Sequence, residues 1–119
     1  MTLCIVVDDN HILLGRKKRK LGKGKYNGYG GNVETGESIE KAALRELYEE
    51  TGGKHGKNYG IHALEYQLLG EMTYIFPDKP EQNQIMYIYR VTKWEGTPCE
   101  TDEMTIEWFD IRKIPYDQM

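Results

Sequence analysis

The sequence is poor in the residues and runs that mark secreted, disulfide-rich or membrane-spanning proteins. Its 119 residues include only two cysteines. Cys4 and Cys99 form neither a disulfide framework nor a metal-site spacing, so we expect both to be reduced thiols. No apolar run is long enough to cross a bilayer, and the apolar start is too short for a secretory signal because Asp8 and Asp9 interrupt it. We therefore expect a cytoplasmic protein without a membrane partner.

Internal repeats, low-complexity segments and nucleophile constellations are also missing. The length suits one compact domain, and we expect residues 1–119 to form it. No combination of Ser, Cys and His indicates catalysis through a covalent intermediate. His11, His55 and His62 are therefore expected at the surface or in packing contacts rather than as metal ligands.

Charge is unevenly distributed along a chain whose net charge is −3. Residues 16–25, the basic run, contain seven of the 16 Lys and Arg residues, which leaves 9 basic against 19 acidic residues elsewhere. A basic run beside an acidic body suggests an anionic ligand, although a solvated loop has the same composition. Nucleic acid is disfavoured as the partner, because no aromatic side chains interleave the run itself.

One helix and several strands are expected. Residues 37–51 lack Gly and Pro and are rich in helix formers, with Ser38 as N-cap and Gly52-Gly53 as a C-terminal stop. Residues 77–83 would connect two strands, and residues 111–119 have the composition of a second helix that is just beginning. Strands around one strong helix imply a mixed α/β or α+β domain. The β-branched, apolar and tyrosine-rich stretches that predict strands are 2–7, 11–15, 61–69, 72–76, 85–91 and 105–109.

Three carboxylates share one face of the predicted helix. At 100° per residue, Glu46, Glu49 and Glu50 fall within about a third of the helix circumference. Neighbouring glutamates repel each other, and the helix dipole disfavours them in the C-terminal half of the helix. A solvated acidic surface is one interpretation. The other is a divalent cation site, because oxygen ligands without His or Cys favour Mg²⁺, Mn²⁺ or Ca²⁺ over zinc.

The wider spacing supports the cation site. It resembles the Nudix box at every position except the last, where Gly53 replaces an aliphatic residue. We expect that departure to affect packing after the helix rather than the chemistry. The matching positions of the box are Gly31, Glu37, Arg45-Glu46-Leu47, Glu49-Glu50 and Gly52.

Other segments resemble the MutT branch of the Nudix hydrolase family, and within it the animal-type hydrolases of oxidised purine nucleoside triphosphates such as 8-oxo-dGTP. These segments are 13–15, the basic run, 26–33 and 96–109. The resemblance implies a mixed β-sheet sandwiched between helices. It also implies a truncated C-terminal helix, because the chain stops at Met119, before the tryptophan and the aspartate pair that read the base in those relatives.

The resemblance further implies a Mg²⁺-dependent pyrophosphohydrolase, with Mn²⁺ as an alternative ion. Water would attack the β-phosphorus of a nucleoside triphosphate and release a monophosphate and pyrophosphate. Arg45 would orient the glutamates, unless it makes an ordinary surface ion pair. Glu37 would tether the preceding loop to the helix or act as a first-turn partner of the helix dipole. By position, the metal ligands are Glu46, Glu49, Glu50 and the Gly31 carbonyl.

A second group of residues is expected around the substrate. Glu103 is a candidate metal ligand or general base, or else an ordinary solvated acid of a loop. If Glu103 is not the base, Glu50 is the alternative. Lys17 would contact and steer the polyphosphate. Asn27 would hydrogen-bond the base or serve as a turn residue before Gly28. Gly30 and Gly31 complete the expected substrate contacts, and the apolar walls or core residues are Leu21, Phe76 and Met104.

Three alternatives remain. Another Nudix activity, on a nucleoside diphosphate derivative or a dinucleoside polyphosphate, is disfavoured because the proline and tyrosine typical of those groups are absent at their spacings. A non-catalytic nucleotide-binding Nudix module would be favoured by loss of box carboxylates, and none is lost. A nucleic-acid binder would depend on the basic run alone, and salt-dependent oligonucleotide binding without hydrolysis would reveal it.

Overall fold

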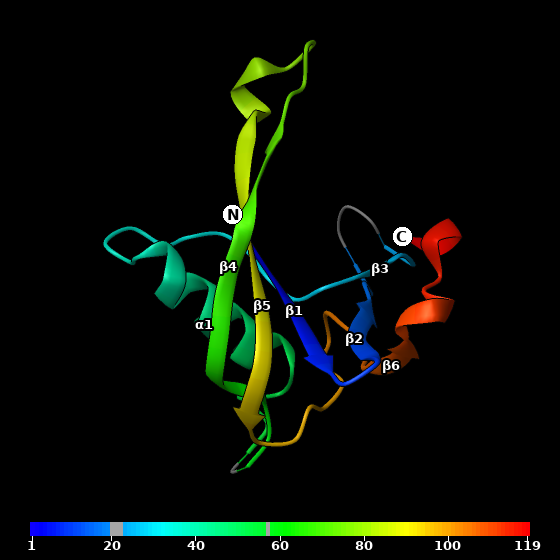
Figure 1. Ribbon diagram of the computed structural model, residues 1–119. Coiled ribbons are helices and arrows are strands. Elements are labelled where there is room, and N and C mark those ends of the chain that lie inside the picture. The colour runs from blue at the N-terminus through cyan, green and yellow to red at the C-terminus, as the bar shows by residue number, and fades with distance from the viewer. Residues whose placement is uncertain (20–22, 57) are drawn as a thin grey trace.

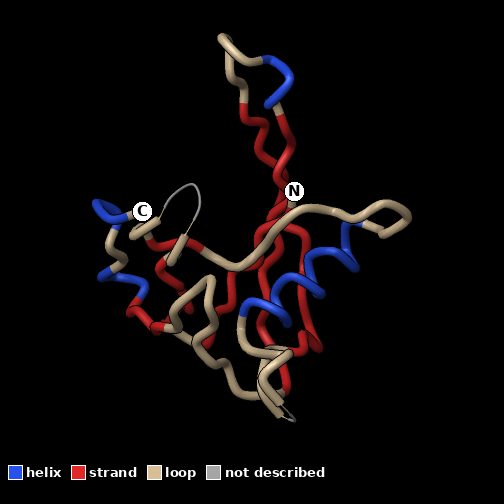
Figure 2. The backbone as a smooth tube through the Cα atoms, turned by 180° about the vertical axis from the view of Figure 1, so that it is seen from behind, coloured by secondary structure: helices blue, strands red, loops and turns tan. Residues whose placement is uncertain are grey.

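The computed structural model describes residues 1–19, 23–56 and 58–119, and in this part of the chain it has a six-stranded mixed sheet and one α-helix (Figure 1). The helix, α1 (Ile39–Glu50), lies across one face of the sheet, as the reverse view in Figure 2 shows. The strands are β1 (Thr2–Asp8), β2 (His11–Arg16), β3 (Tyr26–Asn27), β4 (His62–Tyr74), β5 (Gln84–Glu95) and β6 (Glu107–Asp110). Their order is β3-β2-β1-β5-β4, and β6 pairs with β2. Three short 3₁₀ helices complete the described elements: η1 (Pro80–Gln82), η2 (Ile111–Lys113) and η3 (Tyr116–Gln118).

β1 lies in the middle of the sheet and holds the segment that precedes the helix. It pairs in parallel with β5, but its antiparallel register with β2 covers only Val6–Asp8. The first half of β1 is paired instead with the start of the box. The amides of Thr2 and Cys4 donate to the carbonyls of Gly31 and Tyr29, at 2.8 and 2.6 Å. This pairing brings residues 29–31 alongside β1 and beneath the helix that follows.

The helix forms where the sequence predicts it. The Ser38 hydroxyl accepts a hydrogen bond from the Lys41 amide at 3.2 Å, which satisfies one of the free donors of the first turn. At the other end, Gly52 has a φ of +104°, a left-handed conformation that favours glycine. The apolar side of α1 is buried, since Ala43 and Leu47 belong to the hydrophobic core. The acidic side therefore faces away from the core.

Glycine at position 53 has a packing reason. A Cβ at Gly53 would lie 2.3 Å from Cε2 of Tyr48, so the tyrosine ring occupies the space that an aliphatic side chain would need. The departure from the box thus changes the packing after the helix, as we expected.

Two predicted strands prove to be one. The stretches 61–69 and 72–76 form the continuous strand β4, because Gly70 does not turn the chain. The ladder with β5 shifts register between Leu68 and Gly70, so the glycine is accommodated as an irregularity within the strand. β5 is longer than the predicted 85–91, and the sequence did not predict β3.

The predicted helix at 111–119 is wrong. η2 ends at Lys113 and η3 begins at Tyr116, with Pro115 between them. Proline has no amide hydrogen, and it disfavours helical backbone at the preceding residue; Ile114 accordingly has an extended ψ of 131°. The expected α+β class is confirmed, but within the described residues the sheet carries an α-helix on one face only.

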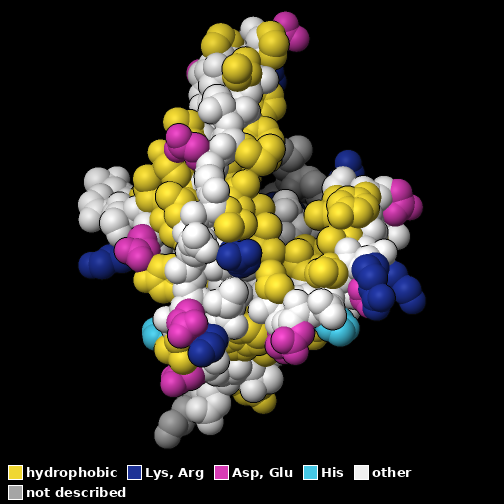
Figure 3. Space-filling model, in the orientation of Figure 1, with side chains coloured by type: hydrophobic (Ala, Val, Ile, Leu, Met, Phe, Trp, Pro, Cys, Tyr) yellow, Lys and Arg dark blue, Asp and Glu magenta, His cyan; other side chains and the backbone are white. Residues whose placement is uncertain are grey.

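β4 and β5 continue past the rest of the sheet as a hairpin arm (Figure 1). Hydrophobic side chains cover much of this arm (Figure 3). Phe76, a predicted wall of the base pocket, lies beyond the end of β4 and is 37% exposed. The exposed apolar residues of the arm are Met72, Tyr74, Ile75, Phe76 and Ile85, and those of β4 within the sheet are Leu64, Leu68 and Leu69.

Within the described residues, no helix has the length and apolarity that crossing a bilayer requires.

Candidate active site

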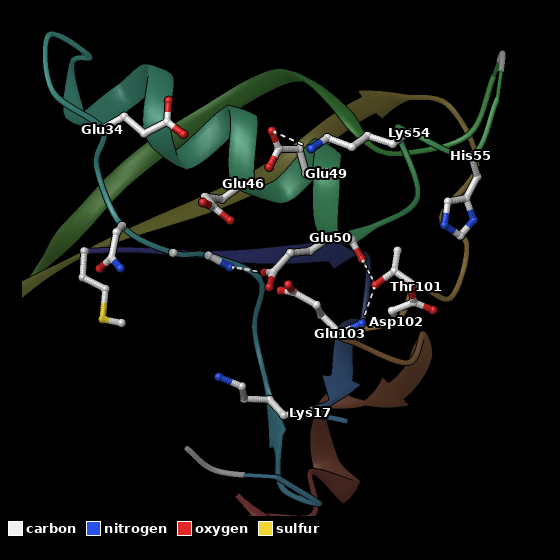
Figure 4. A pocket seen from close by; sticks show the side chains of 14 residues that line it. Lys17, Glu34, Glu46, Glu49, Glu50, Lys54, His55, Thr101, Asp102 and Glu103 are labelled. Atoms are coloured by element: carbon white, nitrogen blue, oxygen red, sulfur yellow. Dashed lines mark hydrogen bonds and ion pairs between the residues drawn. The ribbon is translucent and has the colours of Figure 1, made fainter. Parts of the chain in front are cut away.

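A pocket of about 500 Å³ opens beside the acidic side of α1 (Figure 4). Glu46, Glu49 and Glu50 all line it, so the prediction that they share one helix face is confirmed. Glu103 reaches the same pocket from the loop before β6, and Lys17 reaches it from the residue after β2. The three helix glutamates therefore meet Glu103 and Lys17, which are far from them in the sequence, in one hollow. Glu34, Lys54 and Asp102 also line it.

Arg45 connects the helix to the loop before it. Its Nε and Nη2 donate to the two oxygens of Glu37 at 2.7 and 3.0 Å, in the forked geometry of a guanidinium on a carboxylate. Its Nη1 donates to Glu46 at 3.0 Å and to Glu49 at 3.4 Å. Glu37 also accepts the Glu34 amide at 3.1 Å. These contacts place Arg45 as an orienting group for two of the three helix glutamates, with Glu37 as the tether.

The carboxylate of Glu50 is buried against the start of the box. Its Oε1 accepts the Gly30 amide at 2.8 Å. Burial raises the pKa of Glu50 to about 7, and the negative charges of Glu46 and Glu103 add to the increase, while Gly30 and Lys17 oppose it. Burial also raises the pKa of Glu46, although Arg45 opposes this. A cation in the pocket would stabilise the charged form of both carboxylates and so lower their pKa values.

Glycine at position 31 allows Glu46 to approach the backbone. A Cβ there would lie 2.5 Å from the carboxyl carbon of Glu46, closer than such atoms ever come. The carbonyl of the same residue does not face the pocket as a free acceptor. It accepts the Thr2 amide at 2.8 Å and the Thr2 hydroxyl at 3.1 Å, which uses both lone pairs. In this structure β1 therefore occupies the Gly31 carbonyl, whose ligand role stays a prediction.

The donor set of the pocket fits a hard divalent cation, since its charged ligand groups are carboxylates. Among the described residues, however, no three Asp, Glu, His or Cys side chains are arranged so that they could hold a metal ion as they stand. The side chains of Glu46, Glu49, Glu50 and Glu103 would have to converge around an ion by rotating within the pocket. Their mutual repulsion when no cation lies between them is a physical reason for the wider arrangement.

The loop that carries Glu103 is bound on two sides. The Thr101 hydroxyl accepts the amides of Glu103 and Met104, both at 3.2 Å, and donates to the Glu50 carbonyl at 3.4 Å. The Lys18 amide donates to the Glu103 carbonyl at 2.9 Å, as part of the antiparallel contact that continues β2. Thr101 carries no charge and lies outside the box, so this role could not be predicted from the sequence.

A second, smaller hollow adjoins the first. Asn27 and Met104 line it, and Met104 also belongs to the hydrophobic core, whereas Phe76 belongs to the arm and Leu21 lies outside the described residues. Lys17, Gly30, Gly31 and Glu50 border both hollows, which places the second hollow beside the carboxylates. The sequence did not predict the other lining residues, which are Met1, Thr2, Leu3, Gly28 and Met86.

His55 lies at the rim of the main pocket, while His11 and His62 are exposed strand residues. The Nδ1 atom of His55 is 3.7 Å from the sulfur of Cys99. Both cysteines are free thiols, as expected, and burial raises the pKa of Cys4 to about 12. Neither cysteine contributes to the carboxylate pocket.

Comparison with known proteins agrees with this arrangement. The sequence model of the NUDIX domain matches residues 1–119. The chain is 44% identical to an oxidized purine nucleoside triphosphate hydrolase of Danio rerio over all its residues and 70% of that protein. It is 37% identical to a protein of the same name from Mus musculus, over 97% of this chain and 68% of the mouse protein.

Solved structures of NUDIX hydrolases share the fold. A MutT NUDIX hydrolase from Burkholderia pseudomallei superposes with a TM-score of 0.78 at 26% identity, over 96% of this chain and 84% of the other. Hydrolases with this domain generally need a divalent metal ion, which agrees with a pocket lined by carboxylates. Since the domain match spans the whole chain and three glutamates of its signature line the pocket, the chain belongs to the Nudix hydrolase family.

Proposed function

We propose that this chain is a Mg²⁺-dependent pyrophosphohydrolase that cleaves an oxidised purine nucleoside triphosphate, such as 8-oxo-dGTP, to a nucleoside monophosphate and pyrophosphate. The observation that carries the proposal is the meeting of Glu46, Glu49, Glu50 and Glu103 in one pocket beside Lys17. The names of the fish and mouse relatives support the substrate class.

Each group has a task that follows from its chemistry. Glu46, Glu49 and Glu50, joined by Glu103, would hold Mg²⁺, with Mn²⁺ as a substitute. The ion supplies charge neutralisation for the polyphosphate. Lys17 would bind phosphate oxygens through its ammonium group. Two carboxylates are candidates for the base that takes a proton from the attacking water, Glu50 and Glu103.

The adjoining hollow would take the base of the nucleotide. Leu3 and Met86 supply apolar surface, and Asn27 supplies an amide that can both donate and accept hydrogen bonds. In this structure the Asn27 Oδ1 accepts the Gly28 amide at 2.9 Å, which leaves its amide NH₂ group to face a ligand. A purine altered at its hydrogen-bonding edge would be distinguished by such groups more strongly than by apolar walls.

The test is pyrophosphate release from a panel of normal and oxidised purine triphosphates with Mg²⁺. Glu46→Gln should abolish release, because it removes a charged ligand. Glu71→Gln serves as the matched control, since Glu71 is exposed on β4 and outside the pocket. If wild type is inactive toward the whole panel, or if Glu46→Gln retains full activity, the proposal is wrong. Hydrolysis of nucleoside diphosphate derivatives or dinucleoside polyphosphates alone would assign a different Nudix activity.

A further inference from the structure

Arg19, in the basic run, contacts a pocket carboxylate. Its Nη2 donates to Oε1 of Glu103 at 3.2 Å. The preceding residue, Lys18, pairs with Glu100 in the same acidic loop. Two neighbouring cations therefore bind one loop, but only Arg19 binds a carboxylate that lines the pocket.

The carboxylate of Glu103 needs such a partner. Glu46 and Glu50 lie in the same pocket, and their negative charges repel that of Glu103. The side chain of Glu103 is 44% exposed, so solvent is an alternative position for it. Thr101 and Lys18 hold the backbone of Glu103, and neither contacts its carboxylate. Among the described residues, Arg19 makes the one ion pair found for that group.

We propose that Arg19 is a positioning residue, whose guanidinium keeps the Glu103 carboxylate in the pocket against the repulsion of the helix glutamates. The inference rests on the proposed function, in which Glu103 serves the metal centre. Arg19 is not among the described lining residues of either hollow, so its effect passes through Glu103 and not through contact with the substrate. Part of the basic run thus acts on a pocket carboxylate through an ion pair.

A double-mutant cycle with Arg19→Ala and Glu103→Ala tests this assignment. Arg19→Ala should lower kcat about two- to fivefold, the range that an exposed ion pair can supply, with KM for the nucleotide unchanged. In the Glu103→Ala background the same substitution should have no further effect. Mn²⁺ affinity can be measured without nucleotide by paramagnetic resonance of the free ion. It should fall in Arg19→Ala, and adding Arg19→Ala to Glu103→Ala should not lower it further. Arg19→Lys should restore part of both quantities.

Lys18→Ala is the matched control, because it removes the same charge from the adjacent residue and an ion pair to the same loop. It should leave kcat and Mn²⁺ affinity within twofold of wild type. Equal losses in Lys18→Ala and Arg19→Ala would mean that general charge matters and would overturn the inference. So would a change in KM alone, or a loss from Arg19→Ala that persists in the Glu103→Ala background. If the wild type hydrolyses no triphosphate, the proposed function fails, while the Mn²⁺ cycle still decides the role of Arg19.

Discussion

The amide of Gly30 donates a hydrogen bond of 2.8 Å to the Glu50 carboxylate, and this contact joins the residue before the box to the last turn of its helix. The carboxylate is buried there among Glu46 and Glu103, with a pKa of about 7. A charge held at that position destabilises the protein until a cation neutralises it. Function and stability are therefore opposed at Glu50, and their opposition can be measured.

Glu50→Gln should give a more stable and inactive protein. Glutamine keeps the acceptor for the Gly30 amide but removes the buried charge, so in metal-free buffer at pH 8 its free energy of unfolding should exceed that of wild type. Pyrophosphate release should fall about 100-fold or more, as expected when a ligand or base is lost. Urea unfolding and the triphosphate assay on the same preparation measure both effects. A variant less stable than wild type would contradict the burial of a repelled carboxylate.

The stability of the metal-free protein should depend on pH. The folded pKa of Glu50, about 7, lies above its ordinary value of 4.5. The folded state therefore binds the proton more tightly, and stability present below pH 4.5 is lost as the pH rises through 7. The loss should amount to up to about 3 kcal/mol and should be absent in Glu50→Gln. Thermal melts between pH 4.5 and 8 record it, and a flat wild-type profile would argue against the shift.

Added Mg²⁺ should reverse that loss at pH 7.5. An ion that binds only the folded protein raises its stability by about 2.7 kcal/mol at 100 times the dissociation constant. The melting temperature should rise with Mg²⁺ or Mn²⁺ and return after chelation. Glu46→Gln should show a much smaller rise, whereas Glu71→Gln should match wild type. Equal rises in all three proteins would indicate that the ion binds elsewhere.

Gly31→Ala and Gly30→Ala should fail in different ways. The Cβ at position 31 would meet the flexible carboxylate end of Glu46, at 2.5 Å from its carbon, so the side chain can move and the fold should survive without activity. The Cβ at position 30 would lie 1.9 Å from the Thr2 carbonyl oxygen, which is backbone of the central strand. That variant should lose about 1–3 kcal/mol of stability or more. Circular dichroism melts and the activity assay separate the two outcomes, and similar stabilities for both variants would refute this distinction.

Arg45→Lys should reduce activity although the charge is kept. A lysine ammonium cannot reproduce the fork on Glu37 together with the contact to Glu46, so the glutamates lose their orientation. We expect kcat to fall about 10- to 100-fold, the usual cost of losing a group that orients metal ligands. Arg112→Lys is the control, because Arg112 makes a similar fork on Asp110 outside the pocket. Unchanged kcat in Arg45→Lys would show that a simple charge is sufficient there.

Asn27→Ala should affect recognition of the base and spare the chemistry. Its amide borders the adjoining hollow and is not among the residues that line the carboxylate pocket. KM for an oxidised purine triphosphate should rise about tenfold, the worth of one good hydrogen bond, with kcat little changed. Steady-state kinetics on 8-oxo-dGTP and dGTP measure the difference. A fall in kcat with constant KM would instead assign Asn27 to the reacting phosphates.

Local sequence was sufficient to predict α1 and the helix face on which its glutamates lie. Ser38, the glycine pair at 52–53 and the spacing of Glu46, Glu49 and Glu50 act within a few residues, so helix geometry alone places the three carboxylates together. The pairing of Arg45 with the glutamates follows from the same geometry. The continuous strand β4 was harder to predict, because the ladder with β5 decides whether Gly70 bends the chain or is absorbed. The break at Pro115 was a local signal that the helix prediction for 111–119 overlooked, since proline disfavours helical backbone at the residue before it.

The sequence by itself determined the family, the helix and the acidic face of the pocket, because all three depend on residue types at short, fixed spacings. Only the tertiary structure decided which distant groups complete the site. β1 binds the Gly31 carbonyl through Thr2, the Lys18 amide binds the Glu103 carbonyl, and Arg19 binds the Glu103 carboxylate. These contacts join segments that are tens of residues apart, and no spacing rule within one helix or strand can specify them.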